Sequence, residues 1–426
     1  MYRCTPIHPS TYRYGSSKNL PNCLEQGAAV PCPHDNHYYG PCGTIPEGTN
    51  FGSEFGWPSA DIMSVSDTVT PPGENVLRAT TGASDFLDYR SQIKNPDYTV
   101  ETMLYANSTM TAMFPTLISR DDATVQGMER WLYLTQALQT RCVGGSFSAY
   151  RQHSEVYGAL NWAINSIWLG PAWGSISHDG SWKMLQYRNR HLFADVLLSF
   201  VYYVPPSSSK KGYTPAPSSC PEGNTCMHLS NHLATPLDGV CTLVVRDYRT
   251  GTSKLAKAFN GQSGPAGGAD VFSYRTAKLL AEAGCLSADE CYFTASCDQL
   301  GQSAGAVSAQ PFFPGGSSSI NGGPGGSLAT ADLAPAEISV DFDDAGVVPE
   351  TRAVPLISMA LSANTTVPYV FASSTIAGVF DDNTLLLRPG APVRLAFFPK
   401  APCSLADFKA ATKVYSMNNF APMLLA

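Results

Sequence analysis

A chain of 426 residues can bury a large core and exceeds the size of one small domain, so we expect two to four domains. Charged residues make up only 14% of the chain, whereas glycine and proline number 36 and 32, which favours turn-rich β modules over a helical bundle. The net charge of −7, with no basic patch, argues against a nucleic-acid partner, and no apolar run is long enough to span a membrane.

The first part of the chain has the pattern of a parallel α/β architecture. Residues 49–56 are short, apolar and bounded by turn residues, as a buried strand would be. The clearest helix spans 123–143, with its apolar side chains on one face and an expected end at Gly144. Residues 158–165 predict a second buried strand, and a helix from about 182 to 194 follows.

The second part of the chain changes to strands and turns after a Pro/Ser/Lys linker at 205–220. Residues 242–248 predict a strand and residues 275–284 a short helix. The segment 302–328 is rich in Gly, Ser and Pro, and we expect a disordered insert because it cannot fill a core. From 336 to 398 strands alternate with turns, which indicates a β-sandwich of immunoglobulin type.

Cysteine usage indicates an oxidising compartment, because the chain has 12 cysteines. Two sequons make Asn107 and Asn364 candidate glycosylation sites, which points the same way. Cys285 and Cys291 flank a short turn that can bring their Cα atoms within bridging distance, so we expect a disulfide between them. The N-terminus lacks the apolar core of a signal peptide, and we expect further residues upstream.

Glu54 is the most notable carboxylate. It lies at the C-terminal end of an apolar strand, where barrel enzymes place catalytic groups, although a strand-end ion pair is the alternative. Trp162, Asn165 and Trp168 lie at the end of the second strand and in the loop after it. An indole there can stack on a sugar ring and an amide can bond its hydroxyls, although core packing is the alternative.

Two further patterns carry no site. Cys32, His34, His37 and Cys42 are residue types that zinc accepts, but their spacing fits no standard finger, so no metal is expected. Residues 301–305 match the nucleophile elbow of α/β-hydrolases, but Gly/Ser-rich chain follows where that elbow needs a helix. We therefore interpret the second match as chance.

Several motifs together resemble the glycoside hydrolase family that contains β-mannosidases, β-galactosidases and β-glucuronidases. Ser53-Glu54-Phe55-Gly56-Trp57 is similar to the family's nucleophile strand, residues 35–39 to the segment before it, and residues 131–143 to a barrel helix. The most specific match is 158–191, GALNWAINSIWLGPAWGSISHDGSWKMLQYRNRH, which is close to the β-mannosidase pattern GALYWQLNDIWxxPSWxSIxxxGxWKxLHY. Residues 379–399 resemble the terminal immunoglobulin-like domain.

The resemblance implies the C-terminal part of a (β/α)8 barrel, residues 1–204, followed by two immunoglobulin-like β-sandwich domains. The first sandwich would span 205–334, with the Gly/Ser-rich insert at 302–328, and the second would span 335–426. A location in the lysosome or vacuole, or outside the cell, is implied as well.

The activity implied is that of a retaining β-mannosidase that removes terminal β-mannose residues from oligosaccharides and glycoproteins. The partner is then a β-mannoside oligosaccharide, with no cofactor. Glu54 becomes the nucleophile, and the side chains expected to contact substrate are His37, Tyr38, Trp57, Trp162 and Asn165.

The sequence also departs from the family pattern. Pro58 replaces a Gln, and Ala163 and Ser166 replace the Gln and Asp of the tryptophan strand. The family's acid/base glutamate follows an Asn, and this chain contains no Asn-Glu dipeptide. We therefore expect the chain alone to be inactive, with the missing N-terminal half of the enzyme as a candidate partner. Another exo-β-glycosidase of the same family, and a non-catalytic carbohydrate-binding or structural remnant, are the alternatives.

Overall fold

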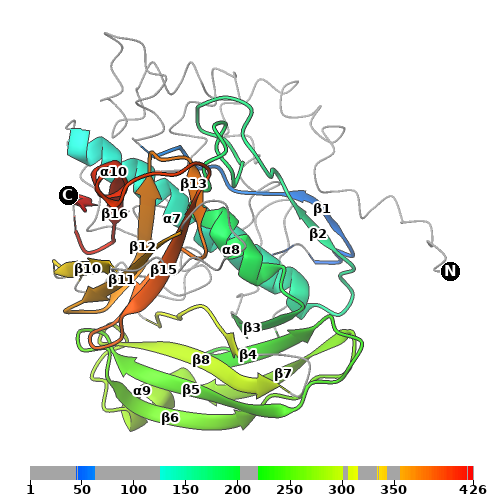
Figure 1. Cartoon of the computed structure of the whole chain (residues 1–426). Coiled ribbons are helices and arrows are strands. Elements are labelled where there is room, and N and C mark those ends of the chain that lie inside the picture. The colour runs from blue at the N-terminus through cyan, green and yellow to red at the C-terminus, as the bar shows by residue number, and fades with distance from the viewer. Residues whose placement is uncertain are drawn as a thin grey trace, which may run out of the picture.

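The computed structural model describes residues 45, 47–62, 125–201, 219–300, 306–314, 333, 335–342, 356–419 and 421–425. Within these ranges the chain forms an α/β unit and two β-sandwiches. Figure 1 shows the first sandwich, β3 to β9, below the other two units, and the long helix α7 behind strands of the second sandwich.

The α/β unit has the order that the sequence predicts. Strand β1 (Gly52–Phe55), helix α7 (Val125–Gln152), strand β2 (Ala159–Asn161) and helix α8 (Met184–Leu192) follow one another, and β1 and β2 pair in parallel. These two strands are the whole parallel sheet in the described part of the chain. The predicted share of a (β/α)8 barrel is therefore not confirmed beyond one β–α–β–α succession.

Helix α7 runs past Gly144, where the sequence predicts its end, and continues to Gln152. A glycine inside a helix costs roughly 0.5–1 kcal/mol relative to alanine. Burial of Phe147 and Tyr150 in the following turns, at 2% and 3% exposed, offsets that cost. Both rings pack on Phe55 of β1 with centroids 4.8 Å away, so tertiary contacts extend the helix. No described helix combines the length and the apolar character required to cross a membrane.

The first sandwich consists of a three-stranded and a four-stranded sheet. Strands β3 (Val196–Val201), β4 (Asn224–Asn231) and β7 (Gly267–Arg275) form one sheet in that order. The other has the order β6-β5-β8-β9, with β6 (Ser253–Asn260), β5 (Gly239–Asp247), β8 (Cys291–Leu300) and β9 (Val307–Ser308). Alternate side chains of β5 and β8, among them Leu243, Val245 and Phe293, fill the core between the sheets.

Two sequence expectations for this unit are wrong. Strand β3 lies in the range assigned to the barrel, but it pairs antiparallel with β4, so the sandwich begins at Val196 and not at residue 205. The segment 302–328 was expected to be disordered, but its part 306–314 is ordered: β9 pairs with β8, and Phe313 is only 5% exposed. Composition missed this because two adjacent phenylalanines suffice to anchor a glycine-rich segment.

Three disulfides lie in or beside the first sandwich. Cys285 and Cys291, the pair expected from the sequence, are bonded with Cα atoms 6.3 Å apart, in the turn after helix α9 (Thr276–Glu282). Cys241 and Cys297 join the neighbouring strands β5 and β8, and Cys220 is bonded to Cys226. Bridges of this kind fit the oxidising compartment that the cysteine count indicates.

The second sandwich has two four-stranded sheets, in agreement with the predicted immunoglobulin type. The strands of one sheet, in spatial order, are β10 (Ile338–Phe342), β11 (Ile357–Ala363), β15 (Val393–Pro399) and β13 (Gly378–Phe380). Those of the other are β14 (Leu385–Leu387), β12 (Val367–Ser374), β16 (Thr412–Tyr415) and β17 (Met423–Leu424), with α10 (Leu405–Ala411) before β16. Phe380, Phe397 and Phe408 pack on one another in the core.

The α/β unit and the second sandwich share one continuous hydrophobic core. The rings of Tyr133 on α7 and Tyr415 on β16 stack with centroids 5.7 Å apart. Arg130 donates to the backbone carbonyls of Ser416, Met417 and Asn419, which fixes the chain after β16 to α7. The second sandwich therefore supports helix α7, which itself packs on β1.

Candidate functional site

Glu54 belongs to a strand that is bonded directly to the strand leading to Trp162. In the parallel register of β1 and β2, Gly52 is opposite Ala159 and Phe55 is opposite Asn161. The backbone N–H of Trp162 donates to the carbonyl of Phe55 at 2.6 Å. Because the carboxyl ends of parallel strands meet at one edge of a sheet, the backbones of Glu54 and Trp162 end at the same edge.

Two glycines allow this close approach. A β-carbon at Gly52 would lie 2.9 Å from the Cζ atom of Tyr150, so the strand can pack on that ring only without a side chain. A β-carbon at Gly56 would collide with the carbonyl oxygen of Trp162. The glycine that follows Phe55 is therefore a requirement of the fit between the two strand ends.

The end of β2 and the loop after it present large apolar side chains to solvent. Trp162 is 52% exposed and Trp168 37% exposed, and the peptide bond between Trp162 and Ala163 is cis. Leu160, Ile164 and Ile167 are also exposed, at 56%, 66% and 70%. The sequence predicts a buried strand at 158–165; a strand is present at Ala159–Asn161, but the expected burial is wrong. An exposed apolar patch of this extent is typical of a binding surface.

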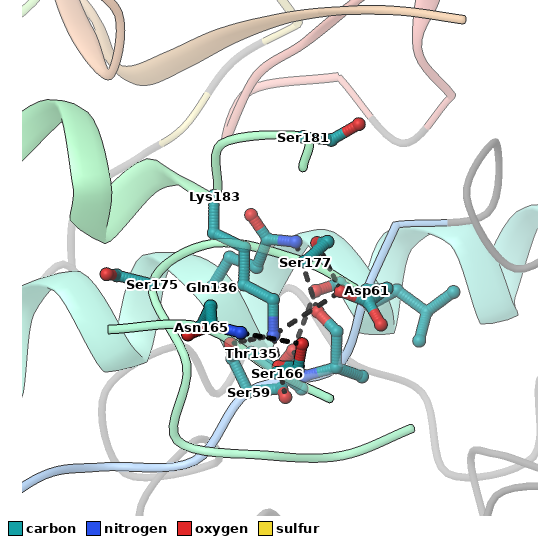
Figure 2. Close-up of polar contacts among 12 residues, drawn as sticks. Ser59, Asp61, Thr135, Gln136, Asn165, Ser166, Ser175, Ser177, Ser181 and Lys183 are labelled. Carbon is teal, nitrogen blue, oxygen red and sulfur yellow. Dashed lines mark hydrogen bonds and ion pairs between the residues drawn. The ribbon is translucent and has the colours of Figure 1, made fainter. Parts of the chain in front are cut away.

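A buried ion pair lies beneath this loop (Figure 2). The Nζ atom of Lys183 lies 3.4 Å from Oδ1 of Asp61, and both side chains are 1% exposed. The hydroxyl of Ser177 donates to the same carboxylate oxygen, and Nζ of Lys183 lies 3.5 Å from the carbonyl and the hydroxyl of Ser59. The pair joins the segment after β1 to the residue that precedes α8.

Helix α7 contributes buried polar side chains to the same cluster. Gln136 Nε2 donates to the carbonyl of Ala60 at 3.0 Å, and its Oε1 accepts from the N–H of Met184 at 3.3 Å. Gln139 Nε2 donates to the carbonyls of Trp57 and Trp173, at 2.7 and 3.1 Å. Each amide thus joins two segments, which explains why polar residues lie in the buried middle of this helix.

The loop itself is held by hydrogen bonds to backbone and side chains. The N–H of Ser166 donates to the carbonyl of Ile176 at 2.8 Å, and the hydroxyl of Ser175 reaches the carbonyl of Ile164 at 3.0 Å. Ser166, which replaces an Asp of the family pattern, is 2% exposed. The loop therefore holds Trp162 and Asn165 on a rigid base at the edge beside β1.

The residues predicted to contact substrate differ in their exposure to solvent. Trp162 and Asn165 are both exposed and come from the same loop. Trp57 is 6% exposed and packs in the core. His37 and Tyr38 lie outside the described residues, and so does the side chain of Glu54, whose role as nucleophile stays a prediction.

Of the two candidate glycosylation sites, the structure describes Asn364. Asn364 is exposed in the turn between β11 and β12, and its Oδ1 accepts from the N–H of Glu337 at 3.0 Å. Asn107 lies outside the described residues. Among the residues that the structure does describe, no group of three or more His, Cys, Asp or Glu side chains could hold a metal ion.

The pair Lys183–Asp61 is the part of the site that sequence reasoning missed. Its one sequence signal is that each charge stands between apolar neighbours, as in Ala60-Asp61-Ile62 and Trp182-Lys183-Met184. A lone charge in an apolar stretch predicts burial with a partner, but the partner is 122 positions away in the sequence (183 − 61).

Comparison with known proteins gives short but consistent matches. Residues 335–420 match the family Ig_mannosidase, an Ig-fold domain. A β-mannosidase of Bos taurus is 45% identical over 74 residues, which are 16% of this chain and 8% of that protein. β-Mannosidase A of Emericella nidulans is 26% identical over 157 residues, covering 35% of this chain and 16% of that protein.

Solved structures match over more of the chain. A β-D-mannosidase from Dictyoglomus thermophilum has a TM-score of 0.60 at 13% identity and covers 86% of this chain and 37% of that one. The exo-chitosanase CsxA of Amycolatopsis orientalis has a TM-score of 0.57 at 14% identity and covers 88% of this chain and 43% of that one. This chain thus spans less than half the length of either protein. At these sequence identities, the similarity shows a shared fold alone.

The solved structures show that the fold, an α/β unit followed by β-sandwiches, also occurs in a β-D-mannosidase and in an exo-chitosanase. The Ig_mannosidase domain and the curated relatives agree on one group. Over these segments the chain is similar to β-mannosidases.

Proposed function

We propose that this chain is the C-terminal part of a retaining exo-β-mannosidase that removes terminal, non-reducing β-D-mannose residues from oligosaccharides and glycoproteins. The observation that carries the proposal is the direct pairing of the Glu54 strand with the strand that ends at Trp162. A carboxylate and an exposed indole at one edge of a parallel sheet suit attack on a sugar that is stacked on the indole.

In this mechanism Glu54 attacks the anomeric carbon and forms a covalent glycosyl-enzyme, which water then hydrolyses. A second carboxyl group, about 5–5.5 Å from the first, protonates the leaving oxygen and later activates the water. The family places that acid after an Asn, and no Asn-Glu dipeptide occurs in this sequence. We propose that an N-terminal half of the enzyme supplies this acid.

The chain's own residues then bind and orient the sugar. Trp162 supplies an apolar floor, and the amide of Asn165 bonds the sugar's hydroxyls. The Lys183–Asp61 pair keeps the loop that carries both residues in one position relative to β1. A fixed position matters because a misplacement of about 1 Å can cost about a hundredfold in rate.

The disulfides support a location in the lysosome or vacuole, or outside the cell. Disulfides such as Cys241–Cys297 persist in the lysosome, in the vacuole or outside the cell, and are rare in the reducing cytosol.

The test joins the 426-residue chain to the N-terminal half of a related β-mannosidase and measures hydrolysis of 2,4-dinitrophenyl and alkyl β-mannosides. We expect turnover of both by the assembled enzyme, and loss of turnover with Glu54→Gln. Glu155→Gln, which removes an exposed carboxylate in the turn after α7, is the matched control and should retain activity. If Glu54→Gln keeps full activity, the nucleophile is wrongly assigned.

A non-catalytic, carbohydrate-binding chain is the second candidate, and Ala163 and Ser166 favour it because they replace polar family residues. The hydroxyl of Ser166 is buried and has no hydrogen-bond partner among the described residues. This candidate predicts that the assembled enzyme binds mannose but turns over neither substrate. Restoration of activity by Ala163→Gln together with Ser166→Asp would then identify the two replacements as the cause.

A further inference from the structure

A cavity of about 420 Å³ lies where the three units of the chain meet. Its lining comes from helix α8, from β5, β8 and β9 of the first sandwich, and from β12 and β14 of the second. That volume falls within the range of small-molecule sites, which is roughly 300–1,000 Å³. None of the residues assigned to the mannoside site lines it.

The charge of this cavity is strongly positive. Three arginines, Arg188, Arg246 and Arg388, and one histidine, His191, contribute to the lining. Asp382 is the one acidic residue among the lining residues, and its Oδ1 is already 3.2 Å from Nε2 of His191. For Arg246 and Arg388, Asp382 is therefore the one acidic side chain among the residues that line the cavity.

Arg246 and Arg388 are held close to each other across the two sandwiches. Nη1 of Arg246 donates to the carbonyl of Gly251 at 3.2 Å, and its Nε donates to the hydroxyl of Thr294 at 3.1 Å. A β-carbon at Gly251 would lie 3.2 Å from Cβ of Arg388, so Arg388 packs on the residue that Arg246 binds. Burial, and then the charge of Arg388, lower the pKa of Arg246.

The partners that hold Arg246 are neutral, so they position its charge without neutralising it. Two like charges in a half-buried site repel each other, and a bound anion would remove that repulsion. Hydroxyl groups of Thr242, Ser296 and Ser308 add donors around the same space. The lining thus combines uncompensated positive charge with hydrogen-bond donors, which is the chemistry of oxyanion recognition.

The backbone supplies an independent observation. In the described residues, three non-glycine residues have positive φ, and two of them, Tyr369 at 53° and Thr384 at 63°, line this cavity. Such conformations cost about 1–3 kcal/mol each and cluster at ligand sites. The carbonyl of Tyr369 is tied to the hydroxyl of Tyr133 at 2.7 Å, so α7 helps to hold this geometry.

We propose that this cavity binds a small oxyanion ligand, a sulfate, phosphate or carboxylate group carried by a molecule of about monosaccharide size. Arg246 and Arg388 bind the anionic group from opposite sandwiches, and the hydroxyls bind the rest of the ligand. Occupancy fixes the two sandwiches to each other and to α8. The site is separate from the mannoside site and does not depend on its function.

The test uses the full 426-residue chain and measures its melting temperature and, by calorimetry, its ligand affinity. The probes are inorganic sulfate, inorganic phosphate, glucuronate and glucose 6-phosphate, with sodium chloride keeping the ionic strength constant and glucose as the neutral control. We expect the anions to raise the melting temperature and glucose to leave it unchanged. The probe that binds most tightly identifies which oxyanion the cavity prefers. An equal rise in sodium chloride alone would overturn the proposal.

Variants separate a ligand-binding role from a structural one. Arg388→Gln should weaken oxyanion binding roughly 10- to 100-fold, the effect of losing a hydrogen bond to a charged group, and Arg388→Lys should restore part of it. Without ligand, Arg388→Gln should not lower the melting temperature, because it removes a repulsion. Arg249→Gln removes an exposed arginine of the neighbouring turn and should bind as the parent does. Unchanged affinity in both Arg388→Gln and Arg246→Gln would overturn the proposal.

Discussion

Lys183 and Asp61 form an ion pair of 3.4 Å in which each side chain is 1% exposed, and this pair ties the segment after β1 to the start of α8. Breaking a buried pair by removing one partner leaves an uncompensated charge and costs roughly 3–5 kcal/mol. We predict that Asp61→Asn and Lys183→Met each lower the free energy of unfolding by about this amount in urea denaturation.

The double variant Asp61→Asn/Lys183→Met should be more stable than the sum of the two single losses implies, because no lone charge remains buried. The exposed pair of Lys278 and Glu282, 3.9 Å apart, is the matched control, and Lys278→Met should cause no measurable loss. Additive losses at 61 and 183 would mean that the two charges do not interact.

Gly56 has no room for a side chain, because a β-carbon there would collide with the carbonyl oxygen of Trp162. A backbone carbonyl cannot turn aside as a side chain can. Gly56→Ala should therefore separate β1 from β2 and destabilise the chain by roughly 1–3 kcal/mol. Gly264→Ala is the control, since nothing lies within 4 Å of a β-carbon there. Equal urea midpoints for the two variants would contradict the expectation.

The disulfides of the first sandwich should differ in what they contribute to stability. Cys241 and Cys297 are 56 positions apart, and Cys285 and Cys291 are 6 apart. Because the entropy of the unfolded chain falls more when a longer loop is closed, removing the first bridge should cost about 2 kcal/mol more than removing the second. Paired Cys→Ala variants in urea denaturation test this, and an equal cost would show that strain or packing dominates.

Acid should destabilise the chain partly through His153. Burial, and then the charge of His228, lower the pKa of His153, although Glu155 and Asp270 act in the opposite direction. The folded state therefore takes up this proton less readily than the unfolded chain does. The contribution of neutral His153 to stability is complete above the pKa of about 6.5 that the residue has in the unfolded chain. It is lost as the pH falls toward the lower pKa of His153 in the folded state.

His153→Gln removes this titration, so the free energy of unfolding of the variant should fall less between pH 7 and 5 than that of the parent. The measurement is urea denaturation at several pH values. An unchanged slope would mean that His153 binds its proton equally well in both states.

Trp162 should contribute to substrate binding in the assembled enzyme, because we propose that its exposed indole forms the floor of the sugar subsite. We expect Trp162→Ala to lower kcat/KM for β-mannosides by roughly tenfold or more, as the loss of a stacked ring implies. Leu286→Ala, at a 93% exposed position of the first sandwich, is the control and should not change kcat/KM. Full activity of Trp162→Ala would place the sugar elsewhere.

The sequence alone determined the succession of elements in the α/β unit, the β character of the second half and the motif that carries Glu54. It could do so because these features are local: apolar periodicity, turn residues and the resemblance of residues 158–191 to a family pattern. The Cys285–Cys291 disulfide could be predicted for the same reason, because a short turn limits how far apart its two ends can lie.

Tertiary structure decided what depends on distant contacts. Helix α7 passes Gly144 because Phe147 and Tyr150 pack on β1, and β3 joins the first sandwich because its edge pairs with β4. The Lys183–Asp61 pair and the cavity between Arg246 and Arg388 each unite residues more than a hundred positions apart. No local pattern specifies such pairs, because burial and charge compensation arise only when separate segments exclude water together.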